Sequence, residues 1–90
     1  MGGRIAVVGL GLIGGSLAMA LRGFEDYTIV GVDVDQATLE FARAHGAADE
    51  VTEDAAGAIA HADVVFLCMH PQGIVDFLQA NRDGFRPGAL

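Results

Sequence analysis

Three glycines near the start of the sequence have the spacing of a phosphate-binding turn. Gly9, Gly11 and Gly14 match the pattern G-x-G-x-x-G and directly follow the apolar run of residues 5–8. Gly9 permits a tight turn, Gly11 lets a pyrophosphate approach the backbone because it lacks a Cβ atom, and Gly14 allows a helix to pack closely on a sheet. The N–H groups that begin this helix would face the negative charge. The pattern therefore predicts a dinucleotide-binding site.

An acidic residue at the expected distance supports this interpretation. Asp33 lies about 20 residues after Gly14 and ends a second apolar run, so its carboxylate can accept hydrogen bonds from the hydroxyls of an adenosine ribose. A 2'-phosphate at this place would meet the charges of Asp33 and Asp35, and residues 23–42 contain no arginine or lysine. The sequence therefore predicts NAD rather than NADP.

A third group of candidates follows the most apolar run of the chain. Met69, His70 and Pro71 would stand where a strand ends beside the first strand, and they could wall the ribose or nicotinamide side of the cofactor. For His70, a partly solvated position before a helix that starts at Pro71 is an equal alternative. The candidate cofactor-binding residues are Gly9, Leu10, Gly11, Leu12, Ile13, Gly14, Asp33, Val34, Met69, His70 and Pro71.

The elements that position these residues alternate between strand and helix. Unbroken apolar runs predict buried strands at residues 5–8, 27–32 and 64–69, with a weak strand at 50–52. Helical spacing predicts helices at residues 12–22, 36–45 and 71–81, and a short alanine-rich helix that ends near residue 61. Asp35 can cap the second helix, and either Thr52 or Asp54 can cap the short one.

The expected buried faces of these helices are built from spaced apolar residues. Leu17, Ala18 and Leu21 lie on one face of the first helix, together with Ile13; the second is expected to bury Leu39 and Ala42, with Phe41 as a further candidate; the fourth presents Ile74, Val75 and Leu78. Residues 82–90 have turn chemistry and could begin another strand.

This alternation predicts an α/β fold. A chain that alternates strand and helix in this way is expected to form a parallel sheet with right-handed crossovers and helices on both faces. The expected strand order is 3-2-1-4, which is part of a doubly wound sheet. Residues 1–90 are enough for one small domain and show no internal repeat or linker.

Composition excludes several classes of function. The sequence is 52% hydrophobic with a mean hydropathy of +0.44, which predicts a buried core. Its formal net charge is −7, it has no lysine, and it has no basic run, which disfavours nucleic-acid binding. Residues 5–21 imitate a secretory signal, but their four glycines oppose a helical signal segment or a membrane span. We therefore expect a cytoplasmic protein.

The remaining polar candidates have simpler interpretations. Cys68 is the only cysteine, so it forms no internal disulfide, and we expect it to be a core residue in a reducing compartment. His45 and His61 are each expected at a helix end, where they interact with the helix dipole. The histidines and the cysteine show no metal-ligand spacing. Ser16 is expected to contact a phosphate or the backbone rather than to act as a nucleophile.

Five stretches together resemble a known family. RIAVVGLGLIGGSLAMALR, IVGVDVD, FARAHGAADE, ADVVFLCMHP and RPGAL resemble the N-terminal cofactor domain of the prephenate and arogenate dehydrogenases of tyrosine biosynthesis. The resemblance implies a Rossmann domain that holds NAD or NADP. It matches Gly9, Gly11, Ile13 and Gly14 to the pyrophosphate turn, Asp33 to the ribose acid and Pro71 to the proline after the fourth strand. His70 departs from the small or apolar residue that is usual before this proline.

The resemblance also implies parts that these 90 residues lack. In this family RPGAL leads into a further strand, and a helical domain beyond it dimerises and carries the catalytic histidine. The expected activity is an oxidative decarboxylation, in which hydride passes to the nicotinamide while carbon dioxide leaves and the ring becomes aromatic. We expect the chain to bind NAD without catalysing this reaction. We also expect an open edge on the strand at 64–69 and a homo-oligomer formed through this edge or the C-terminal tail.

Two alternatives share the same signals. One is the cofactor domain of another β-hydroxyacid-type dehydrogenase or an imine reductase, which carries the same glycine fingerprint. The other is a non-catalytic nucleotide-sensing module, such as the cytosolic domains that gate potassium transport, which also combines a glycine turn with an acid at a strand end. Choosing between prephenate and arogenate depends on residues outside this sequence.

Overall fold

Strands and helices alternate along the whole chain, as the apolar pattern predicts. The computed structural model describes residues 3–89, without the side chains of residues 12 and 13. The strands are β1 (Arg4–Val8), β2 (Thr28–Val32), β3 (Glu50–Thr52) and β4 (Val64–Leu67). The helices are α1 (Leu12–Leu21), α2 (Gln36–Ala44), α3 (Ala55–Ala60) and α4 (Pro71–Asn81).

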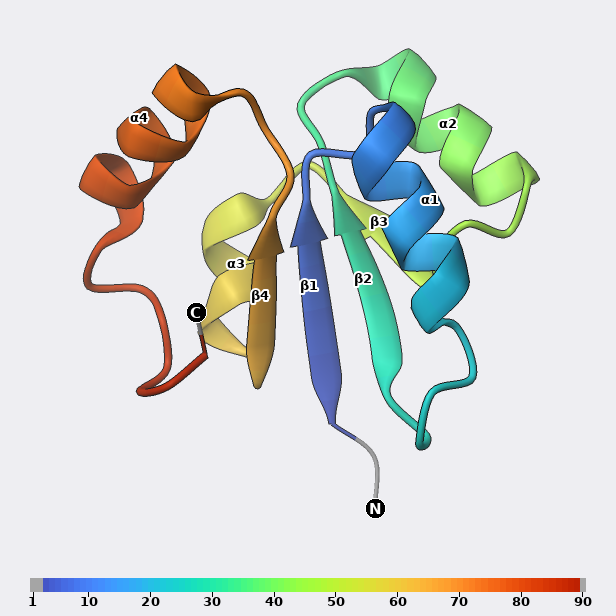
Figure 1. The fold of residues 1–90 in the computed structure, drawn as a ribbon, viewed down its shortest axis with the longest axis horizontal. Helices are drawn as coiled ribbons and strands as arrows, with labels where there is room; N and C mark the ends of the chain where they lie inside the picture. Colours follow the sequence, from blue (N-terminus) through green and yellow to red (C-terminus); the bar gives the residue numbers. More distant parts are fainter. Residues whose placement is uncertain (1–2, 90) are drawn as a thin grey trace.

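The four strands form one parallel sheet in the order β3-β2-β1-β4, which confirms the predicted topology. The first strand of the sequence is therefore central. Ile5 is paired with Ile29 of β2 on one side and with Val64 of β4 on the other. This order brings the carboxyl ends of β1, β2 and β4 side by side, at the edge of the sheet where the helices α1, α2 and α4 begin (Figure 1).

Helices cover both faces of the sheet, and each face has its own core (Figure 1). Helices α1 and α2 pack on one face, and α3, α4 and the C-terminal tail pack on the other. The first core contains Ile5, Val7, Leu10, Ala18, Ile29, Leu39, Ala42, Ala47 and Ala48. The second contains Ala6, Val8, Val30, Val32, Ile59, Ala62, Val65 and Ala89. Alternating residues of β1 serve the two cores, as expected for a strand that is buried on both sides.

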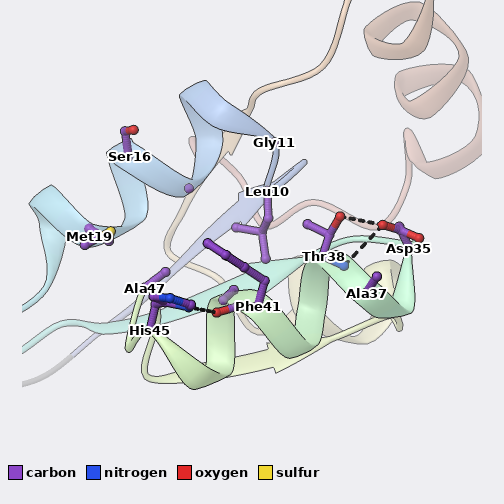
Figure 2. A pocket seen from close by; sticks show the side chains of 12 residues that line it. Leu10, Gly11, Ser16, Met19, Asp35, Ala37, Thr38, Phe41, His45 and Ala47 are labelled. Carbon is purple, nitrogen blue, oxygen red and sulfur yellow. Dashed lines mark hydrogen bonds between the residues drawn. The ribbon is translucent and has the colours of Figure 1, made fainter.

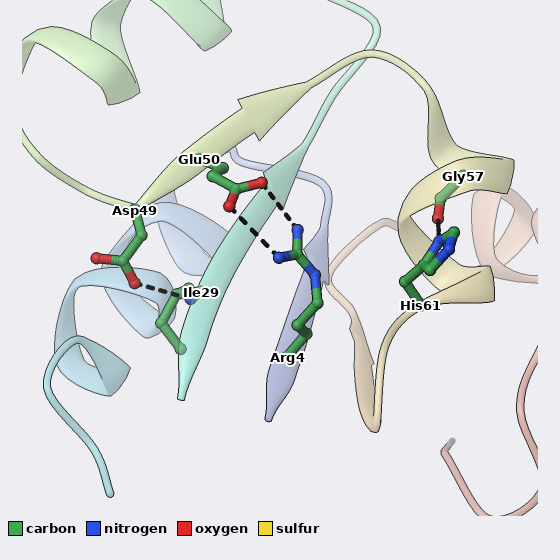
Figure 3. Close-up of polar contacts among 6 residues, drawn as sticks. All are labelled: Arg4, Ile29, Asp49, Glu50, Gly57 and His61. Carbon is green, nitrogen blue, oxygen red and sulfur yellow. Dashed lines mark hydrogen bonds and ion pairs between the residues drawn. The ribbon is translucent and has the colours of Figure 1, made fainter. Parts of the chain in front are cut away.

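Polar contacts fix the amino ends of the strands (Figure 3). The guanidinium of Arg4 on β1 donates to both carboxylate oxygens of Glu50 on β3, at 2.8 and 3.4 Å. The Asp49 carboxylate accepts a hydrogen bond from the N–H of Ile29 at 2.8 Å. These contacts hold β3 in register although it is only three residues long.

The helix ends follow the sequence predictions closely. Asp35 caps α2 by accepting from the N–H of Thr38, and Asp54 caps α3 by accepting from the N–H of Gly57. At the opposite end of α2, Nδ1 of His45 lies 2.9 Å from the carbonyl oxygen of Phe41. Figure 3 shows the matching contact in α3, where Nδ1 of His61 lies 3.0 Å from the carbonyl oxygen of Gly57. Both histidines are therefore helix-terminal residues. No helix within residues 3–89 has the length and apolarity needed to cross a membrane.

Three strand boundaries differ from the prediction. β1 begins at Arg4 rather than at Ile5. Tyr27 remains in the turn before β2, because its N–H donates to the carbonyl oxygen of Phe24. β4 ends at Leu67 rather than Met69, since its partner β1 ends at Val8. Helices α1, α2 and α3 each end about one residue earlier than predicted, which is a normal difference because helix ends fray.

Two predicted core positions are wrong. Phe41 is 65% exposed, because Leu39 and Ala42 occupy the inner face of α2 while the Phe41 ring stacks on His45 with centroids 4.0 Å apart. Val75 is 46% exposed on α4. Phe77 takes the inner position instead and packs against the second core.

The C-terminal tail changes the expected picture of the sheet edge. The N–H of Val65 donates to the carbonyl oxygen of Ala89 at 2.8 Å, and Ala89 is buried in the second core. Arg86 supports the tail through an ion pair with Asp63 at 2.8 Å. β4 is the outermost strand of the sheet within residues 3–89, as expected, and the tail covers its outer edge at Val65.

Candidate functional site

The glycine turn leaves β1 through a backbone conformation that favours glycine. Gly9 has φ +95°, and its N–H donates to the carbonyl oxygen of Val32 at 2.8 Å. A Cβ atom on Gly9 would lie 2.6 Å from the carbonyl oxygen of Cys68. The first glycine therefore serves the tight turn, as the spacing predicts.

The other two glycines of the pattern stand in different surroundings. A Cβ atom on Gly14 would run into the carbonyl oxygen of Gly9 and would lie 3.1 Å from the Cβ atom of Cys68. By contrast, no described atom lies within 4 Å of a Cβ atom built on Gly11. Gly14 thus holds α1 close to the turn, while the space in front of Gly11 is open.

The start of α1 differs from the starts of the other three helices. Its N-cap is Gly11, which provides no side-chain acceptor. Asp35, Asp54 and His70 cap α2, α3 and α4 with their side chains. The first N–H groups of a helix lack partners within the helix. Those of α1 are left without a side-chain cap, at the place where the glycine pattern predicts a phosphate.

Asp33 lies directly after β2 and faces the same turn. Its Oδ2 accepts a hydrogen bond from the N–H of Leu10 at 2.8 Å, and its Oδ1 accepts one from the N–H of Asp35 at 3.0 Å. The side chain is partly buried. The predicted ribose acid is therefore in direct contact with the predicted phosphate turn.

A cavity of about 210 Å³ brings several predicted residues together. It lies at the carboxyl ends of β1, β2 and β4, where open parallel sheets bind their ligands. Gly9, Asp33, Val34 and Met69 line this carboxyl-end cavity. The other residues that line it, which the sequence pattern does not predict, are Val8, Val32, Ala55 and Phe77. Phe77 could have been found from its helical spacing three residues after Ile74.

A larger cavity of about 500 Å³ opens between α1 and α2 (Figure 2). Leu10 and Gly11 contribute to it from the glycine turn, and Met19, Phe41 and His45 line it from the two helices. It is a groove between helices rather than a space at the strand ends. The carboxyl-end cavity is therefore the better candidate for the cofactor, although it is the smaller of the two.

The remaining predicted residues have separate positions. Leu12 and Ile13 begin α1, and their side chains lie outside the described part of the structure. His70 and Pro71 are exposed and line neither cavity. His70 is the N-cap of α4, where Nδ1 accepts from the N–H of Gly73 at 3.3 Å, and Pro71 is the first helical residue. The alternative interpretation of His70, as the residue that precedes a helix, agrees with this geometry.

Cys68 lies behind the glycine turn as a half-buried residue. It packs against the first core, and its N–H donates to the carbonyl oxygen of Val8 at 2.8 Å. Burial raises the pKa of the Cys68 thiol, so its reactive thiolate form is disfavoured. Within residues 3–89, no group of His, Cys, Asp and Glu side chains could hold a metal ion.

Comparison with known proteins agrees with the predicted resemblance. A cyclohexadienyl dehydrogenase from Zymomonas mobilis is 41% identical over 67 residues, which are 73% of this chain and 23% of that protein. The arogenate dehydrogenase of Synechocystis has a TM-score of 0.85 at 37% identity, over 97% of this chain and 31% of the other. The prephenate dehydrogenase of A. aeolicus, solved with hydroxyphenyl propionate and NAD+, has a TM-score of 0.82 at 26% identity, over 93% and 30%.

These relatives confirm the resemblance to prephenate and arogenate dehydrogenases, and they share the α/β Rossmann-like fold. The chain spans between a quarter and a third of the two solved relatives, and less than a quarter of the cyclohexadienyl dehydrogenase. One family model covers residues 4–87, which is nearly the whole chain. The chain therefore belongs to the family described as NADP oxidoreductase, coenzyme F420-dependent.

Proposed function

We propose that residues 1–90 are the N-terminal NAD-binding portion of a prephenate or arogenate dehydrogenase. The observation that carries this proposal is the meeting of three features at the carboxyl ends of β1 and β2. The start of α1 has no side-chain cap, the space in front of Gly11 is open, and Asp33 lies against the turn. A pyrophosphate fits the first two features and a ribose fits the third.

The charges favour NAD over NADP. The ribose acid Asp33 and the neighbouring Asp35 would both repel a 2'-phosphate, and no arginine lines the carboxyl-end cavity. The family description mentions NADP, but the choice between the two cofactors depends on the residue after β2 rather than on the fold. NAD+ is the nucleotide bound in the A. aeolicus relative.

The reaction proposed for the whole protein is the oxidative decarboxylation that the resemblance implies. NAD bound to this chain would supply the acceptor for the hydride that leaves the substrate ring. In this chain, the glycine turn and Asp33 would bind and orient the cofactor. We propose that substrate binding and proton removal need a further helical domain, because the two solved relatives are about three times as long as this chain. Oxidation of prephenate or arogenate by the 90 residues alone would contradict this division.

Calorimetry with NAD and NADP tests the cofactor site. We expect wild type to bind NAD more tightly than NADP. Gly11→Ala should fold normally, because nothing described lies near the new methyl group, yet it should weaken NAD binding at least tenfold, since this methyl group fills the space of the pyrophosphate.

Gly15→Ala is the matched control for this experiment. It adds the same methyl group one turn into α1, where the nearest described atom is the carbonyl oxygen of Leu10 at 3.4 Å. We expect this variant to bind NAD like wild type. The absence of NAD binding in folded wild type, or equal affinities of Gly11→Ala and wild type, would contradict the proposed site. Tighter binding of NADP than of NAD would instead agree with the NADP that the family description names.

We also propose that the protein self-associates along the outer edge of β4. This strand ends the sheet, and Phe66 in its middle is 37% exposed, while the tail reaches the edge at Val65. Exposed strand edges and apolar side chains favour pairing with another chain. Light scattering at tens of micromolar should show a dimer or larger species that Phe66→Lys converts to monomer, and a monomeric wild type would contradict this proposal.

A cytoplasmic location completes the proposed function. It rests on the half-buried, unpaired thiol of Cys68, which suits a reducing compartment, and on the cofactor proposed above. Cell fractionation with an antibody to the whole protein tests it, and recovery of the protein in a membrane or secreted fraction would contradict it.

A further inference from the structure

The hydrogen bond between Leu10 and Asp33 joins the phosphate turn to the end of β2. The N–H of Leu10 lies between Gly9 and Gly11 in the turn, and it donates to Oδ2 of Asp33 at 2.8 Å. The preceding N–H, that of Gly9, donates to the carbonyl oxygen of Val32 at 2.8 Å. Two successive backbone groups of the turn are therefore held by two successive residues of the β2 end.

The carboxylate of Asp33 is fixed before any ligand arrives. Its second oxygen, Oδ1, accepts from the N–H of Asp35 at 3.0 Å, so backbone groups hold both oxygens. A carboxylate offers about four acceptor positions, so two bonds still leave room for the two hydroxyls of a ribose. The same side chain can hold the turn and accept a ribose at once.

The side chain of Leu10 is held in place as well as its backbone N–H. Its side chain is 5% exposed, and a Cβ atom on Gly31 of β2 would lie 2.6 Å from its Cδ1 atom. Gly11, the N-cap of α1, follows directly. The position of Leu10 therefore determines where the first N–H groups of α1 point.

We infer that Asp33 is a positioning residue for the phosphate turn, in addition to its role as the ribose acid. This inference rests on the proposed NAD function and deepens it. It implies that the preference for NAD and the shape of the phosphate site depend on one carboxylate. Replacing Asp33 to relieve the repulsion of a 2'-phosphate would also release Leu10. We therefore expect Asp33→Ser to lose affinity for NAD without becoming a good NADP binder.

A probe without a ribose separates the two roles. Inorganic pyrophosphate makes no ribose contact, so a purely ribose-binding Asp33 would only repel it, and removal of the charge would tighten its binding. If Asp33 positions the turn, Asp33→Ala should instead bind pyrophosphate at least threefold more weakly than wild type. Asp35→Asn is the matched control. It removes the same charge two residues away but can still cap α2, so we expect pyrophosphate binding equal to or tighter than that of wild type.

Hydrogen exchange at the Leu10 amide tests the inference without any ligand. In the free protein, Asp33→Ala should speed the exchange of this amide at least tenfold, and Asp35→Asn should leave it unchanged. Asp33→Asn serves as a second variant if Asp33→Ala folds poorly. Its single carbonyl oxygen can accept from only one of the two N–H groups, so either the Leu10 or the Asp35 amide should lose protection.

The outcomes distinguish this inference from the proposed function. If wild type does not bind NAD but Asp33→Ala speeds hydrogen exchange at the Leu10 amide, the proposed NAD function is contradicted. The anchoring of the turn by Asp33 is then still established. If wild type binds NAD, but Asp33→Ala leaves Leu10 exchange unchanged and binds pyrophosphate as tightly as wild type or more tightly, the inference is overturned. Asp33 would then be a ribose contact only.

Discussion

The imidazole of His70 accepts a hydrogen bond from the N–H of Gly73, with 3.3 Å between the two nitrogen atoms. This contact makes a histidine the N-cap of α4, a position in which Asn, Asp and Ser are the usual residues. It also gives His70 a structural role at the edge of the candidate site.

Replacing His70 by Ala and by Asn tests its role as the N-cap of α4. His70→Ala should lower the free energy of unfolding by about 0.5–1 kcal/mol, because the N–H of Gly73 loses its acceptor. His70→Asn should keep or raise the stability, and both variants should bind NAD like wild type. Urea denaturation and calorimetry measure the two quantities. A loss of NAD affinity in stable His70→Asn would show that the imidazole contacts the cofactor.

Gly14 and its neighbour Gly15 should respond in opposite ways to alanine. Gly14→Ala forces a methyl group against the carbonyl oxygen of Gly9, so we expect a loss of about 1–3 kcal/mol and a displaced α1. Gly15→Ala meets only an ordinary contact with Leu10 and should gain about 0.5–1 kcal/mol from its higher helix propensity. Thermal unfolding followed by circular dichroism compares them, and equal stabilities would contradict the tight packing at Gly14.

Asp63 should matter more for stability than its ion-pair partner Arg86. One Asp63 oxygen accepts from the N–H of Arg4 at 2.9 Å, and the other pairs with the guanidinium of Arg86 at 2.8 Å. Arg86→Ala removes only an exposed ion pair and should cost about 0.5 kcal/mol or less. Asp63→Ala also removes the acceptor at the start of β1 and should cost about 1 kcal/mol more. Urea midpoints of both variants provide the measurement, and equal midpoints would argue against the β1 contact.

Cys68 should make the stability of the fold sensitive to alkaline pH. Burial raises the pKa of its thiol in the folded state, so the folded state holds this proton more tightly than the unfolded chain does. Stability from this group is complete below the ordinary thiol pKa of about 8.5 and is lost as the pH rises through the higher folded value. The pH profile of unfolding should therefore fall more steeply in wild type than in Cys68→Ala. Parallel profiles would mean that the thiol titrates normally.

Much of the fold follows from local patterns, because each element has a local signal. The unbroken apolar runs predict strands that are buried on both faces, and Asp35 and Pro71 mark helix starts by residue type alone. The glycine spacing predicts both the tight turn at Gly9 and the close packing at Gly14. In each case a few neighbouring residues determine the conformation.

The errors arise where several apolar residues compete for one helix face. On α2, a helix of only nine residues, Phe41 and Leu39 could not both face inward, and the smaller Ala42 fits beside the sheet instead. On α4, Phe77 faces inward and Val75 does not. The spacing of apolar residues identifies the apolar side of a helix. The packing of the neighbouring elements then determines which of these residues are buried.

Long-range polar contacts could not be predicted from sequence. The guanidinium of Arg22, at the end of α1, donates to the carbonyl oxygen of Gly46 at 2.6 Å and pairs with Asp49 at 3.0 Å. The contact of Leu10 with Asp33 spans 23 residues in the same way. Such contacts depend on where a crossover returns to the sheet, which no local pattern specifies. The sequence therefore predicts several residues of the candidate site, such as Gly9 and Asp33, but not the bonds that join them.

The central position of β1 has a consequence for the synthesis of the protein. Arg4 contacts Asp63 across 59 residues of sequence, and the partner strand β4 is itself completed by Ala89 near the other end of the chain. Sheets with such distant pairings fold slowly, because the intervening chain must be ordered before the contact forms. On the ribosome, β1 emerges before β2 and β4, and its second edge stays unpaired until β4 has been made. Ala6 and Val7, which are fully buried in the finished sheet, are thus made before either of the strands that pair with them.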